Sequence, residues 1–201
     1  MKFNNFKPSA TNNTNSLTNC TLVTASSLKN KLADLHFIMY NGNVHIIIIT
    51  ESWLHEGITD GLLDSQGLFN VFSSDRTHGR GGGVCVLISN CLPVIAKHSN
   101  LLSDFIVDTN TAVSDDRVYR PDIVCIEPVS LFRIIAVYRP PSNNTALLPS
   151  HTGLLTQHTL FSNKLPTVNV GDFNCPDIDW TNLQSPSDGQ YPKPYISILY
   201  I

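Results

Sequence analysis

The segment Leu165-Pro-Thr-Val-Asn-Val-Gly-Asp-Phe-Asn174 reads as a short apolar strand that runs into a glycine and then into polar residues. Because side chains alternate along an extended chain, Asp172 and Asn174 are expected to point the same way, while Phe173 turns into the core. A carboxylate that activates water, beside an amide that stabilises a phosphoryl oxygen, suits phosphate chemistry. We expect Gly171 to let the backbone of a substrate come close.

Two further strands are predicted to deliver polar residues at their ends. The run Val44–Thr50 is apolar on both faces, which predicts a central strand covered on both sides, and Glu51 follows it directly. A solvated loop carboxylate is the alternative interpretation of Glu51. The segments Ile123–Pro128 and Leu131–Tyr138 read as a strand pair joined by a short turn. Tyr138 then stands at a strand end, where half-buried packing is its alternative role.

The remaining elements are predicted as follows. Ser26 and Ser27 are expected to cap a helix that runs from Leu28 to Ile38 and ends at Asn41-Gly42-Asn43. A poorer helix is expected over 147–163. The segments 67–73 and 84–88 read as a hairpin around a glycine loop. Strands therefore dominate, and the pattern predicts an α/β sandwich of two sheets flanked by helices.

The composition is that of one globular domain. The chain has 201 residues, of which 42% are hydrophobic and 14% charged, and its net charge is -3. This charge argues against a protein that binds DNA non-specifically through a basic face. It does not exclude a nuclease, because a metal site itself contributes acidic residues. Residues 1–20 are rich in Asn, Thr and Ser, so we expect them to be poorly ordered, with the domain over 21–201.

The cysteines and the apolar runs bear on location. The five cysteines form no CxxC pair, so we expect reduced, mostly buried thiols in an intracellular protein, cytoplasmic or nuclear. No run approaches the length of about 18 apolar residues that a membrane span needs, and the N-terminus lacks an apolar signal core. We expect a monomer with no membrane association and no small-molecule cofactor.

Three strand-end motifs stand in order along the chain: Thr50-Glu-Ser-Trp-Leu54, Val137-Tyr-Arg-Pro-Pro-Ser142 and Gly171-Asp-Phe-Asn174, with Arg80-Gly-Gly-Gly-Val84 between the first two. Together they resemble the endonuclease/exonuclease/phosphatase superfamily. More narrowly, they are similar to the apurinic-type endonuclease domain at the N-terminus of non-LTR (LINE-type) retrotransposon polyproteins. The resemblance covers about residues 21–183. It implies a four-layer α/β/β/α sandwich of two packed mixed sheets and Mg²⁺-dependent (or Mn²⁺-dependent) hydrolysis of DNA phosphodiesters.

The resemblance also implies roles for single residues. Glu51 matches the metal-binding glutamate of the family, and Tyr138 matches the tyrosine whose hydroxyl helps hold the scissile phosphate. Asp172 matches the aspartate that orients or deprotonates the attacking water. Asn174 matches the asparagine that hydrogen-bonds the phosphate in the transition state. These roles agree with the preference of a hard cation for carboxylate oxygens.

Further phosphate contacts are expected from Thr24, Arg80 and Arg139. Thr24 departs from the family pattern, because the usual Asn-Ala-Arg-Ser-Leu motif here reads Thr24-Ala-Ser-Ser-Leu28. For Arg80, a position in a solvated loop is equally compatible with the sequence.

A second departure concerns the Ser-Asp-His motif of the family's last strands, in which none of the seven histidines of this chain lies. We therefore expect a truncated or decayed copy, incomplete at its C-terminus and with weak or absent nuclease activity, because losing such a group costs about 10² to 10⁴ in rate. One alternative is an inactive relic with weak nucleic-acid or metal binding. The other is a superfamily phosphatase that acts on a small phosphoester.

Overall fold

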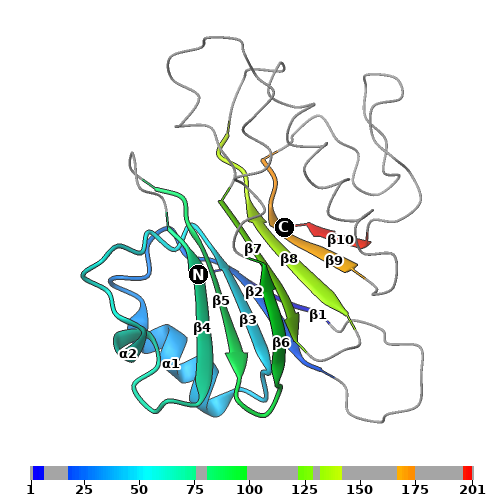
Figure 1. The fold of residues 1–201 in the computed structure, drawn as a ribbon. Coiled ribbons are helices and arrows are strands. Elements are labelled where there is room, and N and C mark those ends of the chain that lie inside the picture. Colours follow the sequence, from blue (N-terminus) through cyan, green and yellow to red (C-terminus); the bar gives the residue numbers. More distant parts are fainter. Residues whose placement is uncertain are drawn as a thin grey trace, which may run out of the picture.

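Two five-stranded mixed sheets pack face to face, and two helices lie on the outer face of the first sheet (Figure 1). The computed structural model describes residues 2–6, 18–75, 81–98, 122–128, 132–141, 167–174 and 197–200. Sheet A has the order β1-β2-β3-β5-β4, formed by Lys2–Phe6, Cys20–Thr24, Ile46–Thr50, Val84–Ser89 and Phe69–Ser74. Sheet B has the order β10-β9-β8-β7-β6, formed by Ser197–Tyr200, Thr167–Asp172, Arg133–Tyr138, Asp122–Pro128 and Val94–His98. Helices α1 and α2 span Leu32–Asn41 and Asp60–Leu63.

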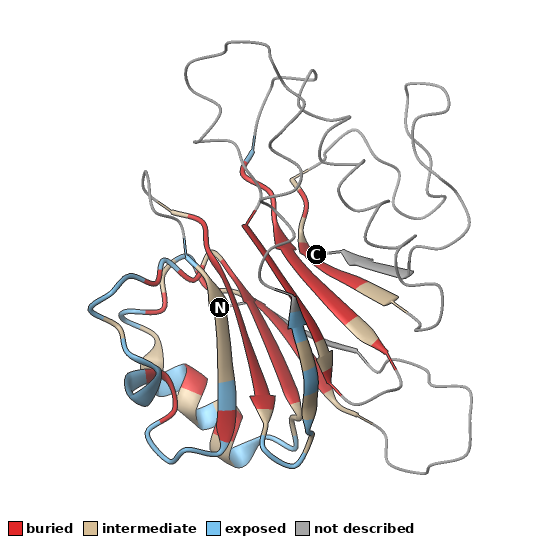
Figure 2. Ribbon diagram, viewed as in Figure 1, coloured by how far each residue is buried: buried red, intermediate tan, exposed pale blue. Residues whose placement is uncertain are grey.

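Strand β3 is the central strand that its isoleucine run predicts, and all five of its residues are buried (Figure 2). Ile46 and Ile48 belong to the core between the two sheets. Ile47 and Ile49 point to the opposite face, where they pack in the cluster that contains Leu35 of α1. Since successive side chains of a strand face opposite ways, this strand anchors both layers at once.

The predicted strand pairs of the two sheets are present. β4 and β5 pair antiparallel, as do β7 and β8. β8 and β9 run parallel, so their carboxyl ends lie at the same edge of sheet B. The predicted α/β class with two packed mixed sheets is confirmed. The helix predicted over 147–163 lies outside the described residues.

The start of the first helix was predicted wrongly. Ser26 and Ser27 have positive φ values of 48° and 83°, and the helix begins only at Leu32. The reason is that the preceding loop continues alongside the exit of β3, where the backbone N–H of Ser27 donates to the carbonyl oxygen of Glu51 at 2.9 Å. The end of the helix at Asn41 is as predicted.

Four short elements had no prediction. Strand β1 lies within the first 20 residues, where the composition indicated no regular element, and it pairs antiparallel with β2. Strand β10 pairs parallel with β9 at the edge of sheet B. Helix α2 and strand β6 were not predicted either. The division into a lead-in over 1–20 and a domain over 21–201 stays a prediction.

The cysteines that the structure describes are all free thiols, and three of them are buried, as expected: Cys20, Cys85 and Cys125. Burial raises the pKa of the Cys20 and Cys125 thiols to about 12, so both are protonated and unreactive at neutral pH. Cys91 is exposed. None of the helices in the described ranges is long and apolar enough to span a membrane.

Candidate active site

The candidate site joins the two sheets at the carboxyl ends of β3, β8 and β9. The hydroxyl of Tyr138, the last residue of β8, donates to Oε1 of Glu51 at 3.1 Å. The ring of Tyr138 is 4% exposed and packs in the core between the sheets. Tyr138 therefore packs in the core and also contacts the candidate metal ligand. Packing and a place beside the site, the two roles that the sequence left open, are both compatible with this position.

Glu51 sits on a strained and well-supported backbone. Its φ is 52°, in the left-handed region that side-chain-bearing residues rarely adopt. Backbone hydrogen bonds flank it on both sides, from Ala25 N–H to Thr50 O at 2.9 Å and from Ser52 N–H to Gly83 O at 3.2 Å. Local strain that the surroundings hold in place is typical of functional sites, and here it fixes where the carboxylate points.

The second oxygen of Glu51 is bound by a residue that the sequence did not select. The Ser26 hydroxyl donates to Oε2 of Glu51 at 3.0 Å. The hydroxyl of Thr24 lies 3.3 Å from that of Thr50, its register partner in β3, and its predicted phosphate contact stays a prediction. The signal that could have found Ser26 is its position, since it follows the end of β2 as Glu51 follows the end of the neighbouring parallel strand.

Asp172 is the register partner of Tyr138, so the two residues meet at the same edge of sheet B. Its pKa is raised above the ordinary value, chiefly because burial disfavours the charged carboxylate, and also because the charge of Glu51 lies nearby. The backbone N–H of Asn174 donates to Oδ1 of Asp172 at 3.1 Å and lowers the pKa in part. The two carboxylates that sequence reasoning chose are thus brought close enough to interact.

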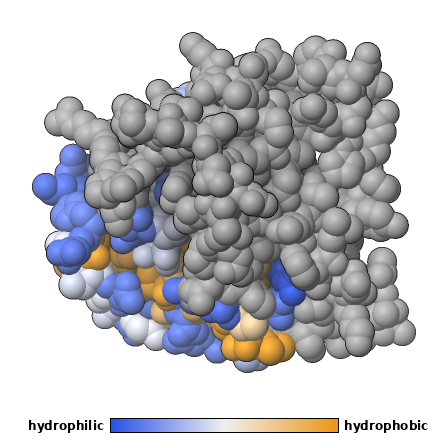
Figure 3. Space-filling model, turned by 45° about the horizontal axis from the view of Figure 1, so that its top comes forward, coloured by the Kyte–Doolittle hydropathy of each residue, from blue (hydrophilic) through white to orange (hydrophobic). Residues whose placement is uncertain are grey.

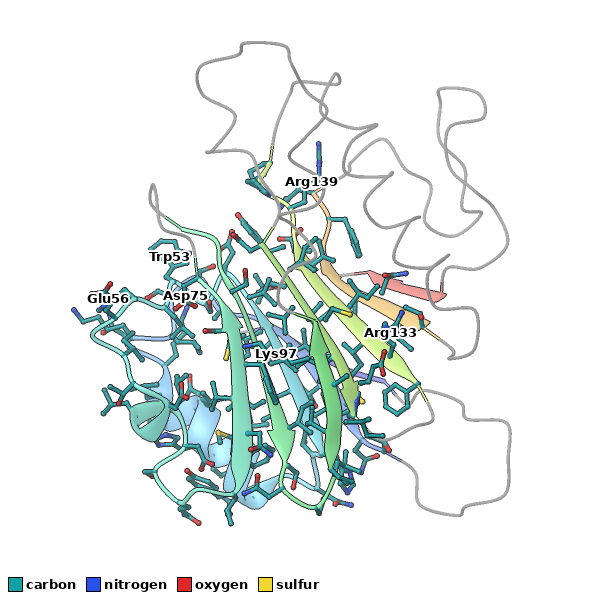
Figure 4. The ribbon with its side chains drawn as sticks, viewed as in Figure 1. Trp53, Glu56, Asp75, Lys97, Arg133 and Arg139 are labelled. Atoms are coloured by element: carbon teal, nitrogen blue, oxygen red, sulfur yellow. The ribbon has the colours of Figure 1, made fainter. Side chains whose placement is uncertain are left out.

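Asn174 and Arg139 hold each other through a ring of hydrogen bonds. The side-chain amide of Asn174 donates to the carbonyl oxygen of Arg139 at 2.7 Å. The Arg139 guanidinium donates in turn to the carbonyl oxygens of Asn174 at 2.6 Å and of Phe173 at 3.3 Å. Arg139 is only 5% exposed, and Figure 4 draws it at the strand-end side of sheet B. These contacts give Arg139 a positioning role, and its predicted phosphate contact stays a prediction.

The alternation predicted around Gly171 holds in part. Phe173 is 4% exposed, which fits the prediction that it turns into the core. Gly171 has a φ of 148°, and a Cβ added there would lie 1.8 Å from the carbonyl oxygen of Val137. The close approach that requires this glycine is therefore made by the neighbouring strand β8, and the role expected for Gly171, admitting a substrate backbone, has no support in this geometry.

The donor set fits a hard divalent cation. No group of three His, Cys, Asp or Glu side chains within the described ranges lies close enough together to hold a metal ion. Mg²⁺, however, needs only one or two protein carboxylates when substrate phosphates and waters complete its shell. Glu51 and Asp172 supply two carboxylates whose mutual repulsion a cation would relieve. Arg80 lies outside the described residues.

Comparisons with known proteins show the fold. No protein-family model matches the sequence, and no curated protein matches it. Among solved structures, the 3′ phosphatase NExo from Neisseria, bound to a product DNA hairpin, aligns with a TM-score of 0.56 and 17% identity, over 80% of this chain and 59% of that chain.

Two other structures align almost as well. An AP endonuclease from Archaeoglobus fulgidus has a TM-score of 0.54 and 14% identity, over 80% of this chain and 58% of that chain. The APE2 catalytic domain from Xenopus laevis has a TM-score of 0.54 and 10% identity, over 78% of this chain and 58% of that chain. This chain thus spans less than two thirds of the length of each of these structures, and over that span it has their fold.

Proposed function

We propose that this chain hydrolyses phosphodiester bonds in DNA with the help of a divalent metal ion, as a member of the endonuclease/exonuclease/phosphatase superfamily. The observation that carries the proposal is the hydrogen bond from Tyr138 to Glu51, made from one sheet to the other beside Asp172. A tyrosine, a glutamate and an aspartate, each at or directly after the end of a different strand, come together where the two sheets meet.

Each residue has a chemical task in this proposal. Glu51 would hold the metal ion, and Mg²⁺ or Mn²⁺ would neutralise charge on the phosphoryl oxygens. Asp172 would take the proton of the attacking water. The side-chain amide of Asn174 donates to the carbonyl oxygen of Arg139 and also hydrogen-bonds Asp172, and in the proposal it would turn one amide hydrogen to a phosphate oxygen when substrate binds. The hydroxyl of Tyr138 would help to hold that phosphate.

We further propose the narrower function that the motifs indicate, a DNA-nicking endonuclease of a non-LTR retrotransposon. Its support is the Thr-Glu-Ser-Trp-Leu and Tyr-Arg-Pro-Pro-Ser contexts of Glu51 and Tyr138. The rate proposed for this chain is low, since none of its histidines lies in a Ser-Asp-His motif that would supply a further group at the phosphate.

The test is nicking of supercoiled plasmid by the purified chain in Mg²⁺. We expect slow conversion to open circles that Glu51→Ala and Asp172→Ala each abolish. Glu56→Gln is a matched control, because Glu56 is an exposed carboxylate on the same loop (Figure 4). Nicking that persists in both site variants would contradict the assignment. Fast nicking that both variants abolish would support the site and contradict the low rate. Release of phosphate from a small phosphoester, without nicking, would favour the phosphatase alternative.

A further inference from the structure

An exposed tryptophan stands next to the candidate site on the same loop as Glu51. Trp53 is 41% exposed, although tryptophan gains much from burial. Figure 4 places it on the strand-end side of sheet A, at the periphery of the molecule. The strands that deliver Glu51 and Arg139 end on this same side. A large aromatic surface is thus left open two residues from the proposed metal ligand.

The backbone holds this side chain in an unfavourable conformation. Trp53 has a φ of 53°, a left-handed value that is an outlier for a bulky residue. A hydrogen bond of 3.0 Å from its N–H to the carbonyl oxygen of Gly82 keeps it there. Since strain of this kind collects at ligand sites, the outlier itself points to a function for the exposed ring.

A glycine of the neighbouring loop supports the indole. A Cβ added at Gly81 would lie 3.4 Å from Nε1 and 3.5 Å from Cε2 of Trp53, so the bare backbone of Gly81 lies beside the ring. The φ of Gly81 is +83°, a value that favours glycine. The ring is thus backed by Gly81, just before β5, and the residue stays 41% exposed.

The net charge of the chain indicates how it would bind a nucleic acid. With 13 Lys plus Arg against 16 Asp plus Glu, the chain has little electrostatic attraction for a phosphate backbone. Arg139 is buried and donates to carbonyl groups beside the site. Stacking of a nucleobase on an aromatic face is the sequence-tolerant alternative to such attraction.

We infer that Trp53 is a stacking platform for an unstacked nucleobase of the bound strand, next to the phosphodiester at Glu51. This inference rests on the proposed function, because it takes nucleic acid as the ligand. It assigns Trp53 to substrate binding and strand positioning, and it makes recognition depend on a base that has left its duplex stack.

The experiment uses the full chain in EDTA, so that binding is measured without turnover. The chain has two tryptophans, and Trp180→Phe leaves Trp53 as the single indole fluorophore. We expect a single-stranded thymidine oligonucleotide of about 15 nucleotides to quench its emission, and a matched oligonucleotide with abasic sites in place of the bases to leave it unchanged. Trp53→Ala should weaken binding of the thymidine oligonucleotide about tenfold, and Trp53→Phe, which keeps a ring, about threefold or less.

Phe37→Ala is the matched control, since Phe37 is 69% exposed on α1 and should leave affinity unchanged. Anisotropy of a labelled oligonucleotide reports binding independently of tryptophan. Saturated binding with unchanged Trp53 emission would overturn the stacking role and leave the proposed function standing. Absence of binding to any oligonucleotide would count against both.

Discussion

Asp122, the first residue of β7 in sheet B, accepts a hydrogen bond of 2.8 Å from the backbone N–H of Gly83, just before β5 of sheet A. The carbonyl oxygen of Gly83 accepts in turn from Ser52, the neighbour of Glu51. A buried carboxylate on one sheet thus fixes the loop that carries the candidate metal ligand on the other. The sequence did not indicate Asp122, because a contact 39 residues away leaves no local pattern.

The first prediction concerns this cross-sheet bond. Asp122→Ala should lower the free energy of unfolding by about 2 kcal/mol, because the Gly83 N–H would be left buried without this acceptor. Asp122→Asn keeps an acceptor oxygen and should cost less. Urea unfolding of the two variants measures the difference. Equal losses for both would show that the negative charge, and not the acceptor, matters.

Removal of the Tyr138 hydroxyl should affect the site more than the fold. Tyr138→Phe should cost about 1 kcal/mol of unfolding free energy and about 10² in nicking rate, since Oε1 of Glu51 loses its donor. Tyr40→Phe is the control, because the Tyr40 hydroxyl, on helix α1, donates to Asp64 at 2.9 Å away from the candidate site. Tyr40→Phe should match the stability loss and leave nicking unchanged. A similar nicking loss in both variants would refute the role of Tyr138.

Binding of Mg²⁺ should be visible as thermal stabilisation. At roughly 100 times its Kd, a ligand adds about 2.7 kcal/mol, which for a chain of this size raises the Tm by about 5 to 10 °C. Glu51→Gln and Asp172→Asn should each remove most of this shift, whereas Glu56→Gln should retain it. Differential scanning calorimetry with and without Mg²⁺ is the measurement. An unchanged Tm in the wild-type chain would mean that the two carboxylates form no metal site.

The raised pKa of Asp172 makes stability depend on pH in a defined direction. Between the ordinary pKa of 3.8 and the raised value, the folded chain binds more protons than the unfolded chain. Stability therefore falls as pH rises through this window and stays lowered above it. Asp172→Asn should stabilise the metal-free chain at neutral pH, by an amount that shrinks as pH falls toward 3.8. Chemical unfolding of both proteins from about pH 4 to about pH 8 tests this, and a pH-independent difference would contradict it.

Strand β8 lies so close to the end of β9 that position 171 requires glycine. Gly171→Ala should cost more than about 4 kcal/mol, because the new Cβ would overlap the carbonyl oxygen of Val137 and the φ of 148° would be strained. Gly61→Ala, in α2, meets only Thr59 at 3.9 Å and should be neutral or slightly stabilising. Soluble yield and far-UV circular dichroism separate the two variants. A well-folded Gly171→Ala protein would show that β8 and β9 can move apart.

The elements that sequence reasoning predicted are those with dense local signals. Strand β3 follows from four consecutive isoleucines, and β8 from its apolar run before Tyr138. Strand β6 was missed because it is a five-residue edge strand whose Ile95 is 59% exposed, so its pattern shows no buried run. Strands β1 and β10 depend on pairing with distant partners, which composition does not encode.

The candidate site likewise contains residues that the sequence could indicate and contacts that it could not. Glu51, Tyr138 and Asp172 stand directly at strand ends, so the sequence could single them out as candidate site residues. The contacts that orient them could not be predicted. Ser26 binds Glu51 only because a loop with positive φ values follows β2, and Arg139 grips Asn174 only because the exits of β8 and β9 meet. Both depend on backbone conformations that have no signature in residue type.

The hydrogen bond between Glu51 and Tyr138 has a consequence for when the candidate site can form. The first residue belongs to sheet A and the second to sheet B, and 87 positions separate them in the chain. During synthesis, Glu51 emerges long before its partners, so neither sheet alone carries the set of groups that would attack a phosphodiester. If the proposed function holds, a nascent or half-folded chain would lack part of the site, and only docking of the two sheets would complete it.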